Sequence, residues 1–368
     1  MIRLAGLDEM PGGSPERERV RRYRRERRPA HRRAMWIGGG SISIPGDPFK
    51  AGAGGPPPFS GNWADLFPGA FQVVQSDKGI EYGAVMRADA GNTSSVAFAL
   101  TGASPAVAVP IWIRITAPGV GNVYYDGLGI TPAMAGVTIV DSVNIVLTGA
   151  GAGMAITPGV GSQAPGDTWR ATCSLQADQS GNGKNATQVT PANQPLVAMG
   201  PNGVACLSGA ATGDGYLRTN ALNLPSPDVT PYWVFLVLRI DVYGSALPVM
   251  GNFDFALTNQ LYPSNVTGLT QRHQFNVSNP GAGIAEGSWF IVEIKRSNSA
   301  ADPFKVGGSL VTGNAGVGAV ATECMFQSPG SGYGSLASML AKVYTPNAPD
   351  WPAIRAAVTA KYGPVVAV

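Results

Sequence analysis

The chain has 368 residues, enough for two ordinary domains or one large all-β domain. Only 13% of the residues are charged and 44% are hydrophobic, while 49 Gly and 30 Pro interrupt the sequence at short intervals. This composition argues against a helical bundle and against a disordered polar chain, because apolar residues recur in short blocks between turn-forming residues. We therefore expect an all-β body.

The net charge of +3 conceals a basic N-terminus. Residues 1–33 contain eleven Arg and five acidic residues, whereas the rest of the chain has 15 basic and 18 acidic residues. Residues 1–36 are predicted to be a docking arm that contacts protein or nucleic acid. Two alternative interpretations remain, a solvated tail and an extension that precedes a working start at Met35. The arginines assigned to docking are Arg17, Arg19, Arg21, Arg22, Arg24, Arg25, Arg27, Arg28, Arg32 and Arg33.

A Gly/Pro-rich linker is predicted over residues 37–62, with an extended proline run at 56–58. Short strand candidates then follow one another between turn sequences up to residue 174. We expect residues 63–175 to form a small immunoglobulin-like β-sandwich. Its acidic residues stand singly at turns and predict no catalytic group.

From residue 176 the strand candidates become longer. Residues 232–242 are apolar on both faces and predict a central strand, whereas 289–296 alternate and predict a half-buried one. A helix is predicted after the N-cap Asp350, with Ile354, Val358 and Tyr362 on one face and Gly363 at its end. Residues 176–368 are thus predicted to be a second β-sandwich with a C-terminal helix.

One polar segment carries a family resemblance. The string at 178–188, DQSGNGKNATQ, followed by ANQP at 192–195, resembles the opening of concanavalin A-like (laminin-G-like) jelly-roll domains. Similar domains, common in tailed-phage virion proteins and bacterial surface proteins, close with a strand and a helix ending near Tyr-Gly, as at 340–363 here. The resemblance covers residues 176–363 and implies a jelly roll rather than any one activity.

The same segment allows two interpretations. Asp178, Ser180 and Asn182 are spaced so that their oxygens could bind calcium, but the set has one carboxylate, and a self-satisfied structural loop explains the same residues. We favour the loop and predict no metal and no cofactor. Cys173, Cys206 and Cys324 are widely spaced and odd in number, which predicts buried free thiols.

The sequence gives little support for an enzymatic function. The Glu-x-Asp-x-x-Glu string of jelly-roll glucanases is missing, and Glu286, Glu293 and Glu323 form no pair by strand parity. His273 has no Gly-x-Ser-x-Gly partner sequence. No catalytic residue is predicted. Four aromatic residues in or beside loops, Tyr216, Tyr262, Tyr333 and Trp351, are candidates for stacking on sugar rings. The simpler interpretation, which we favour, is that Trp351 packs the final helix and Tyr216 begins a strand.

The resulting hypothesis is a non-catalytic structural protein of a tailed bacteriophage or phage-like particle, such as a head fibre, decoration, collar or tail-adhesion subunit. Its expected partners are other virion proteins, further copies of itself in a homo-oligomer, host surface glycans and, through the arm, nucleic acid. The expected location is the virion, after synthesis in the bacterial cytoplasm, without membrane insertion because no apolar run is long enough. The alternatives are a bacterial surface lectin or adhesin and, less favoured, a glycosidase.

Overall fold

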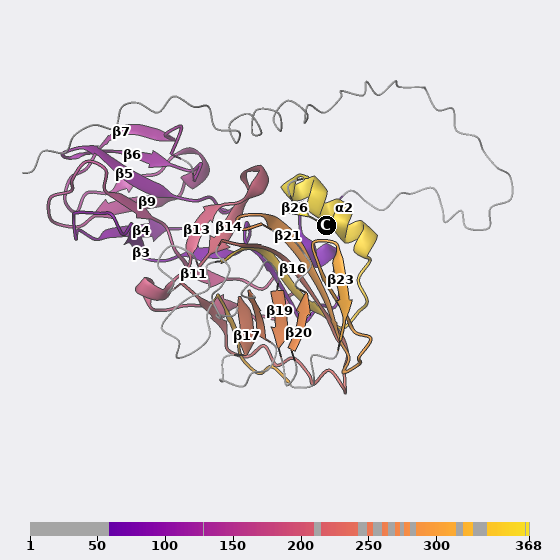
Figure 1. Cartoon of the computed structure of the whole chain (residues 1–368). Coiled ribbons are helices and arrows are strands. Elements are labelled where there is room, and N and C mark those ends of the chain that lie inside the picture. The colour runs from indigo at the N-terminus through magenta and orange to yellow at the C-terminus, as the bar shows by residue number, and fades with distance from the viewer. Residues whose placement is uncertain are drawn as a thin grey trace, which may run out of the picture. The chain divides into compact units, whose positions relative to one another are not determined.

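The computed structural model describes residues 59–127, 129–209, 215–241, 249–252, 260–263, 269–272, 276–279, 285–313, 319–326, 337–364 and 366–367. These residues belong to one compact unit that starts at Pro58. They form an all-β fold of sandwiches with a C-terminal helix, as the sequence predicted (Figure 1). The predicted docking arm and all but the last four residues of the predicted linker lie outside the described residues.

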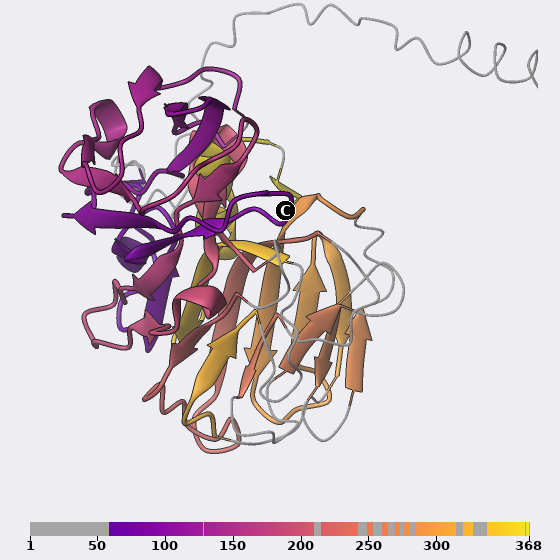
Figure 2. The same cartoon turned by 90° about the vertical axis from the view of Figure 1, so that its left-hand side faces the viewer.

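A large sandwich is made from two nine-stranded sheets, A and B, whose strands occupy the lower part of Figure 2. Sheet A contains, in spatial order, β13 (Leu196–Met199), β14 (Ala205–Ser208), β25 (Ala337–Thr345), β16 (Tyr232–Ile240), β21 (Trp289–Arg296), β22 (Pro303–Val306) and β23 (Ser309–Thr312), with β1 (Gln72–Gln75) paired to β25 and β26 (Val366–Ala367) paired to β21. Sheet B contains β2 (Ile80–Tyr82), β11 (Cys173–Gln176), β12 (Ala186–Thr187), β15 (Leu217–Thr219), β24 (Glu323–Met325), β17 (Met250–Asn252), β18 (Gln260–Pro263), β19 (Leu269–Arg272) and β20 (Asn276–Asn279).

A small sandwich is made from a continuous ladder of eight strands folded around its own core. In spatial order these are β7 (Met134–Thr138), β6 (Val120–Tyr124), β5 (Trp112–Ala117), β10 (Thr168–Arg170), β3 (Val85–Ala88), β4 (Phe98–Gly102), β9 (Met154–Pro158) and β8 (Ile145–Val146). Phe98 and Trp169 pack against each other in this core with tilted rings, whose centroids are 4.3 Å apart. Short 3₁₀ helices occur at η1 (Trp63–Asp65), η2 (Gly149–Gly151), η3 (Pro191–Asn193) and η4 (Pro201–Gly203).

The small sandwich is an insertion in the large one. Strands β2 and β11 are antiparallel neighbours in sheet B, with Tyr82 opposite Cys173, and all eight strands of the small sandwich lie between them in the chain. The predicted order places a small sandwich at 63–175 before a second sandwich at 176–368. Both predicted ends of the small sandwich are wrong, because its strands extend only from β3 to β10. Strands β1, β2 and β11 belong to the large sandwich. The sequence did not predict this, because alternation within a strand does not reveal which sheet the strand joins.

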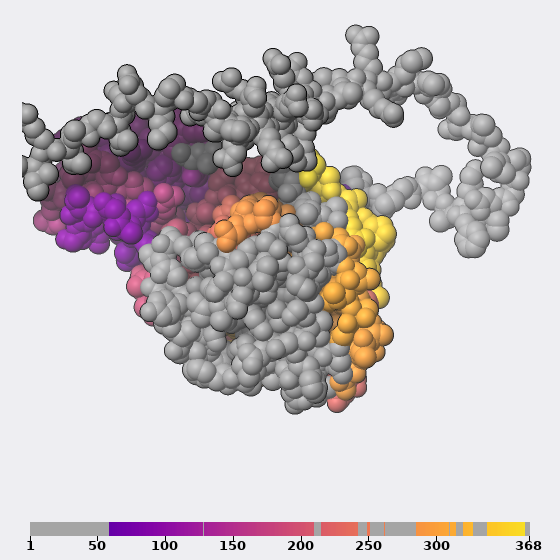
Figure 3. Space-filling view, viewed as in Figure 1, coloured from indigo at the N-terminus to yellow at the C-terminus, as the bar shows by residue number. Residues whose placement is uncertain are grey.

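Strand β16 is buried on both faces, as predicted for 232–242. Val234, Leu236 and Leu238 point into the core between sheets A and B, whereas Phe235 and Val237 point to the opposite face of sheet A. That outer face is covered by α2 (Trp351–Tyr362), which is shown in yellow at the molecular surface in Figure 3. Strand β21 is also more buried than its alternation predicted, because α2 shields its second face.

The helix begins and ends where the sequence predicted. The Asp350 carboxylate accepts a hydrogen bond from the Ala353 backbone N–H, and Gly363 follows the last turn with a positive φ. Ile354, Val358 and Tyr362 are buried against sheet A. These contacts confirm the predicted helix and its apolar face.

Residues 59–63 are packed against this helix, so the end of the predicted linker is part of the body. Trp63 is fully buried, and its indole N–H donates to the Tyr362 hydroxyl over 2.9 Å. The Gly61 carbonyl accepts hydrogen bonds from Gln75 and Lys361. The two ends of the described chain are therefore held together by buried polar contacts around one aromatic pair.

Replacing Tyr362 with Phe should leave the buried Trp63 N–H without an acceptor. We expect a loss of about 1–3 kcal/mol in the free energy of unfolding, measured by urea denaturation. In a Trp63→Phe background, which removes the donor, the same Tyr362→Phe change should cost clearly less. Equal costs in the two backgrounds would show that the hydrogen bond contributes nothing.

Candidate binding site

Of the four aromatic residues predicted to bind glycan, the structure describes the side chains of two, and these two lie apart. Tyr333 and the side chain of Tyr262 lie outside the described residues. Half-buried Tyr216 precedes β15 in sheet B, whereas Trp351 begins α2 on the outer face of sheet A. The Trp351 ring packs edge-on against Trp233, with centroids 5.9 Å apart. Tyr216 and Trp351 thus lie on opposite sides of the large sandwich.

The polar loop that resembles a jelly-roll opening is held by its own hydrogen bonds. The Asp178 carboxylate accepts from the backbone N–H groups of Val73, Ser180 and Lys184 and from the Ser180 hydroxyl. The Asn182 amide donates to the Ala70 carbonyl 2.8 Å away. These contacts support the structural-loop interpretation over calcium binding, since the only carboxylate of the set already has four donors.

The buried strand carboxylates Glu293 and Glu323 are paired with cations rather than with each other. Glu293 forms a forked ion pair with Arg355 of α2, whereas Glu323 contacts Lys342 between the sheets. No cluster of three potential metal-ligating His, Cys, Asp or Glu side chains occurs among the residues that the structure describes. His273 lies outside them.

The three cysteines are free and buried, as predicted. Burial raises the pKa of the Cys206 thiol to about 12 and that of Cys173 still further above its ordinary value. Thiols with such raised pKa values carry almost no thiolate at neutral pH and are poor nucleophiles. They therefore act as small packing residues in the core.

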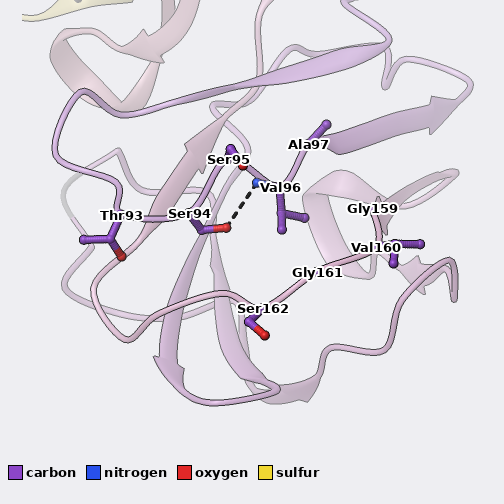
Figure 4. A pocket seen from close by; sticks show the side chains of 9 residues that line it. All are labelled: Thr93, Ser94, Ser95, Val96, Ala97, Gly159, Val160, Gly161 and Ser162. Carbon is purple, nitrogen blue, oxygen red and sulfur yellow. Dashed lines mark hydrogen bonds between the residues drawn. The ribbon is translucent and has the colours of Figure 1, made fainter.

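An open pocket of about 480 Å³ on the small sandwich is the strongest candidate for a ligand site (Figure 4). One wall is the segment 93–97 before β4, and the other is 159–162 after β9. The two walls meet because β4 and β9 pair antiparallel, with Phe98 opposite Pro158. The Gly159 N–H donates to the Ala97 carbonyl, and a Cβ at Gly159 would lie only 2.8 Å from that oxygen.

The pocket offers hydroxyl groups, backbone polar groups and two valines. Its lining residues are Thr93, Ser94, Ser95, Val96, Ala97, Gly159, Val160, Gly161 and Ser162. The Ser94 hydroxyl accepts from the Val96 N–H, drawn as a dashed line in Figure 4, and Val160 is 79% exposed. Because none of the lining side chains titrates near neutral pH, this surface can hydrogen-bond a ligand but holds no general acid or base.

Asp167 holds one wall of the pocket from behind. The residue is 3% exposed, and its carboxylate accepts hydrogen bonds from the N–H groups of Thr93, Ser94 and Ala164 and from the Thr93 hydroxyl. Burial alone would raise the pKa of Asp167, but these hydrogen bonds outweigh it and hold the pKa below its ordinary value. The charged form of Asp167 therefore fixes the conformation of the Thr-Ser segment.

Sequence reasoning missed this pocket and treated Asp167 as one of several isolated turn acids. The available signal was the run Thr93-Ser94-Ser95 beside Asn92, together with a second run of small residues at 159–162. Neither run is distinctive by itself, because small polar residues are ordinary turn residues. Only the pairing of β4 with β9 brings the two runs together.

Comparisons with known proteins identify no family. No family model matches the chain, and a comparison with curated proteins also finds no match. Solved structures that resemble it include a receptor-binding domain of botulinum neurotoxin C/D mosaic serotype, at 12% identity and a TM-score of 0.37, with 50% of this chain and 48% of that chain covered. A GH54 α-L-arabinofuranosidase soaked with a cyclic sulfate inhibitor has 12% identity and a TM-score of 0.43, with 80% and 63% covered. The chain thus spans about half of the toxin domain and less than two thirds of the arabinofuranosidase.

The Asp167→Asn variant should be less stable at neutral pH by about 1–3 kcal/mol, because a neutral amide accepts these hydrogen bonds less well. A lowered folded-state pKa means that the carboxylate stabilises the fold above its unfolded pKa of about 3.9 and loses this effect as the pH falls through the folded value. The difference in the free energy of unfolding between wild type and variant should therefore shrink as the pH is lowered, as measured by denaturation from pH 7 downward.

The exposed Asp228 provides the matched control. Asp228→Asn should change the free energy of unfolding little at any pH in this range, because this carboxylate is exposed and accepts a hydrogen bond from the hydroxyl of neighbouring Ser226. If the difference in the free energy of unfolding between wild type and Asp167→Asn stayed constant down to strongly acidic pH, this would contradict a role for the charged carboxylate.

Proposed function

We propose that the small sandwich binds a neutral glycan in the pocket between segments 93–97 and 159–162, and that the chain acts without catalysis. The observation that carries this proposal is the lining itself, in which hydroxyls and backbone groups stand beside the valines Val96 and Val160. A sugar ring presents the matching combination of hydroxyl groups and apolar C–H faces. A pocket of about 480 Å³ is in the range that small ligands occupy.

The proposal extends to a structural role in a tailed bacteriophage or phage-like particle. Its support is the resemblance of residues 176–363 to concanavalin A-like domains of virion proteins and the concentration of Arg in residues 1–33. In this role the arm docks onto other virion proteins and several copies assemble, so that weak glycan contacts add up through avidity. No helix in the described part of the chain is long and apolar enough to cross a bilayer.

A lectin or adhesin of a bacterial surface is the second candidate. It shares the pocket and differs in what residues 1–33 do, because a lectin does not need them for assembly into a particle. A glycosidase is disfavoured by the pocket, whose lining includes no carboxylate, and by the cation partners of Glu293 and Glu323.

The pocket is tested by a Ser162→Trp variant of the full chain on an array of neutral glycans. Ser162 is exposed, so the indole should fill the pocket without disturbing the core, and we expect at least a tenfold loss of binding, equivalent to about 1.4 kcal/mol. Thr131→Trp, at an exposed position of the same sandwich outside the pocket, should bind as wild type does. Equal binding by both variants would remove the pocket from the proposal.

The particle role is tested by deleting residues 1–33 and asking by electron microscopy whether the chain still occupies a repeated site on a virion. We expect the truncated chain to fold and to bind glycans but to be missing from particles. Normal incorporation of the truncated chain would refute docking through the arm. A wild-type chain that is found only as a free monomer would favour the lectin.

A further inference from the structure

A buried trio of reactive side chains lies between the two sheets of the large sandwich, away from the pocket. Lys342 on β25 is 0% exposed, Glu323 on β24 is 1% exposed and Tyr344 is 3% exposed. The Lys342 ammonium nitrogen contacts one oxygen of the Glu323 carboxylate, and the Tyr344 hydroxyl donates to the other. The trio therefore joins sheet A to sheet B.

The strand register explains why these side chains meet. Lys342 and Tyr344 are two residues apart on β25, so both point from sheet A toward sheet B. On sheet B, Glu323 lies opposite Thr219 of the neighbouring strand β15. The Gln72 amide donates to the Thr219 hydroxyl and adds a second polar contact between the sheets.

The surroundings are buried and mostly apolar, with the buried Arg296 and Tyr232 near Tyr344 as further polar side chains. Tyr344 belongs to the core between the sheets, together with Leu217, Leu236 and Met325. Its hydroxyl lies 4.0 Å from the Met250 sulfur. A charged amine and a charged carboxylate held here both lose their hydration, which is costly even when they pair. Any reaction that removes both charges relieves that cost.

We propose that Lys342 and Glu323 condense to an intramolecular amide that covalently links β24 to β25. A proton first passes from the ammonium to the carboxylate, which produces a neutral amine and a carboxylic acid. The Lys342 Nζ lone pair then attacks the Glu323 carbonyl carbon, a C–N bond forms and the C–OH bond breaks. The hydroxyl departs with a proton from the nitrogen as water, so atoms and charges balance without an oxidant or a cofactor.

Tyr344 is placed to assist this step. Its hydroxyl donates to the Glu323 oxygen that does not contact Lys342, which is the oxygen where negative charge develops during attack. Burial, followed by the neighbouring Glu323 carboxylate, raises the pKa of Tyr344 well above its ordinary value, so the hydroxyl keeps its proton. Because the fold already holds the amine and the acid in contact, the reaction avoids the entropy cost of bringing two free molecules together.

The other ion pairs between described residues lack this combination. Arg355 presents a guanidinium to Glu293, and a guanidinium stays charged and is not a nucleophile under ordinary conditions. Lys361 pairs with Asp77, but both side chains are about one tenth exposed and Lys361 also donates to the Gly61 carbonyl. The fully buried pair with a hydroxyl donor on its carboxylate is Lys342–Glu323.

The test is the intact mass of the purified full chain after denaturation and reduction, followed by peptide mapping. We expect the chain to be lighter than its sequence by the mass of one water molecule, with a branched peptide that joins Lys342 to Glu323. An unaltered mass, with both residues in separate unmodified peptides, would overturn the proposal and identify an ordinary buried ion pair.

Variants separate the roles of the three residues. Lys342→Arg should restore the full sequence mass, whereas Lys305→Arg, at a half-buried position of β22 in the same sheet, should keep the loss of water. Tyr344→Phe should slow formation of the amide in newly made chain by about 100-fold, the usual contribution of a positioned proton donor. Undiminished formation in Tyr344→Phe would refute the assisting role, and a loss of water in Lys342→Arg would refute the assigned crosslink.

Discussion

Burial of both faces of β16 is the constraint on which the large sandwich depends. Its inner face packs toward sheet B and its outer face packs under α2, so one strand takes part in two cores. A strand of this kind requires a covering layer on each side, since its backbone hydrogen bonds and apolar side chains are both removed from water. The C-terminal helix and the Trp63 segment supply the outer layer, and this explains why the two ends of the described chain meet at Tyr362.

The insertion between β2 and β11 places the pocket on a sandwich with its own core, apart from the core of the large sandwich. The large sandwich completes sheet B across these neighbouring strands, while the small sandwich has its own aromatic core around Trp169. The pocket of the small sandwich consists of segments at strand ends, where side chains can vary without disturbing either core. Polar groups that stabilise structure, such as Asp167 and Asp178, lie behind or beside such loops and are saturated by backbone donors.

Polar groups inside the large sandwich have a different character. Most of its interior is aliphatic, yet Gln72, Thr219, Glu323, Lys342 and Tyr344 form polar contacts between the sheets. Such groups cost free energy unless each finds a partner, and the partners here come from strands distant in the sequence. Covalent closure of the Lys342–Glu323 contact would remove both buried charges and link the two sheets permanently.

The sequence by itself determined the features that depend on neighbouring residues. Composition predicted the all-β class, the two-sided apolar run predicted the central strand, and Asp350 with Gly363 predicted both ends of α2. These signals are local, because strand periodicity and helix caps involve residues a few positions apart. The tertiary structure alone decided that 72–82 join the large sandwich, that 93–97 meet 159–162, and that Lys342 meets Glu323. Each of these depends on strand pairing between distant segments, and no short-range pattern encodes which strands pair.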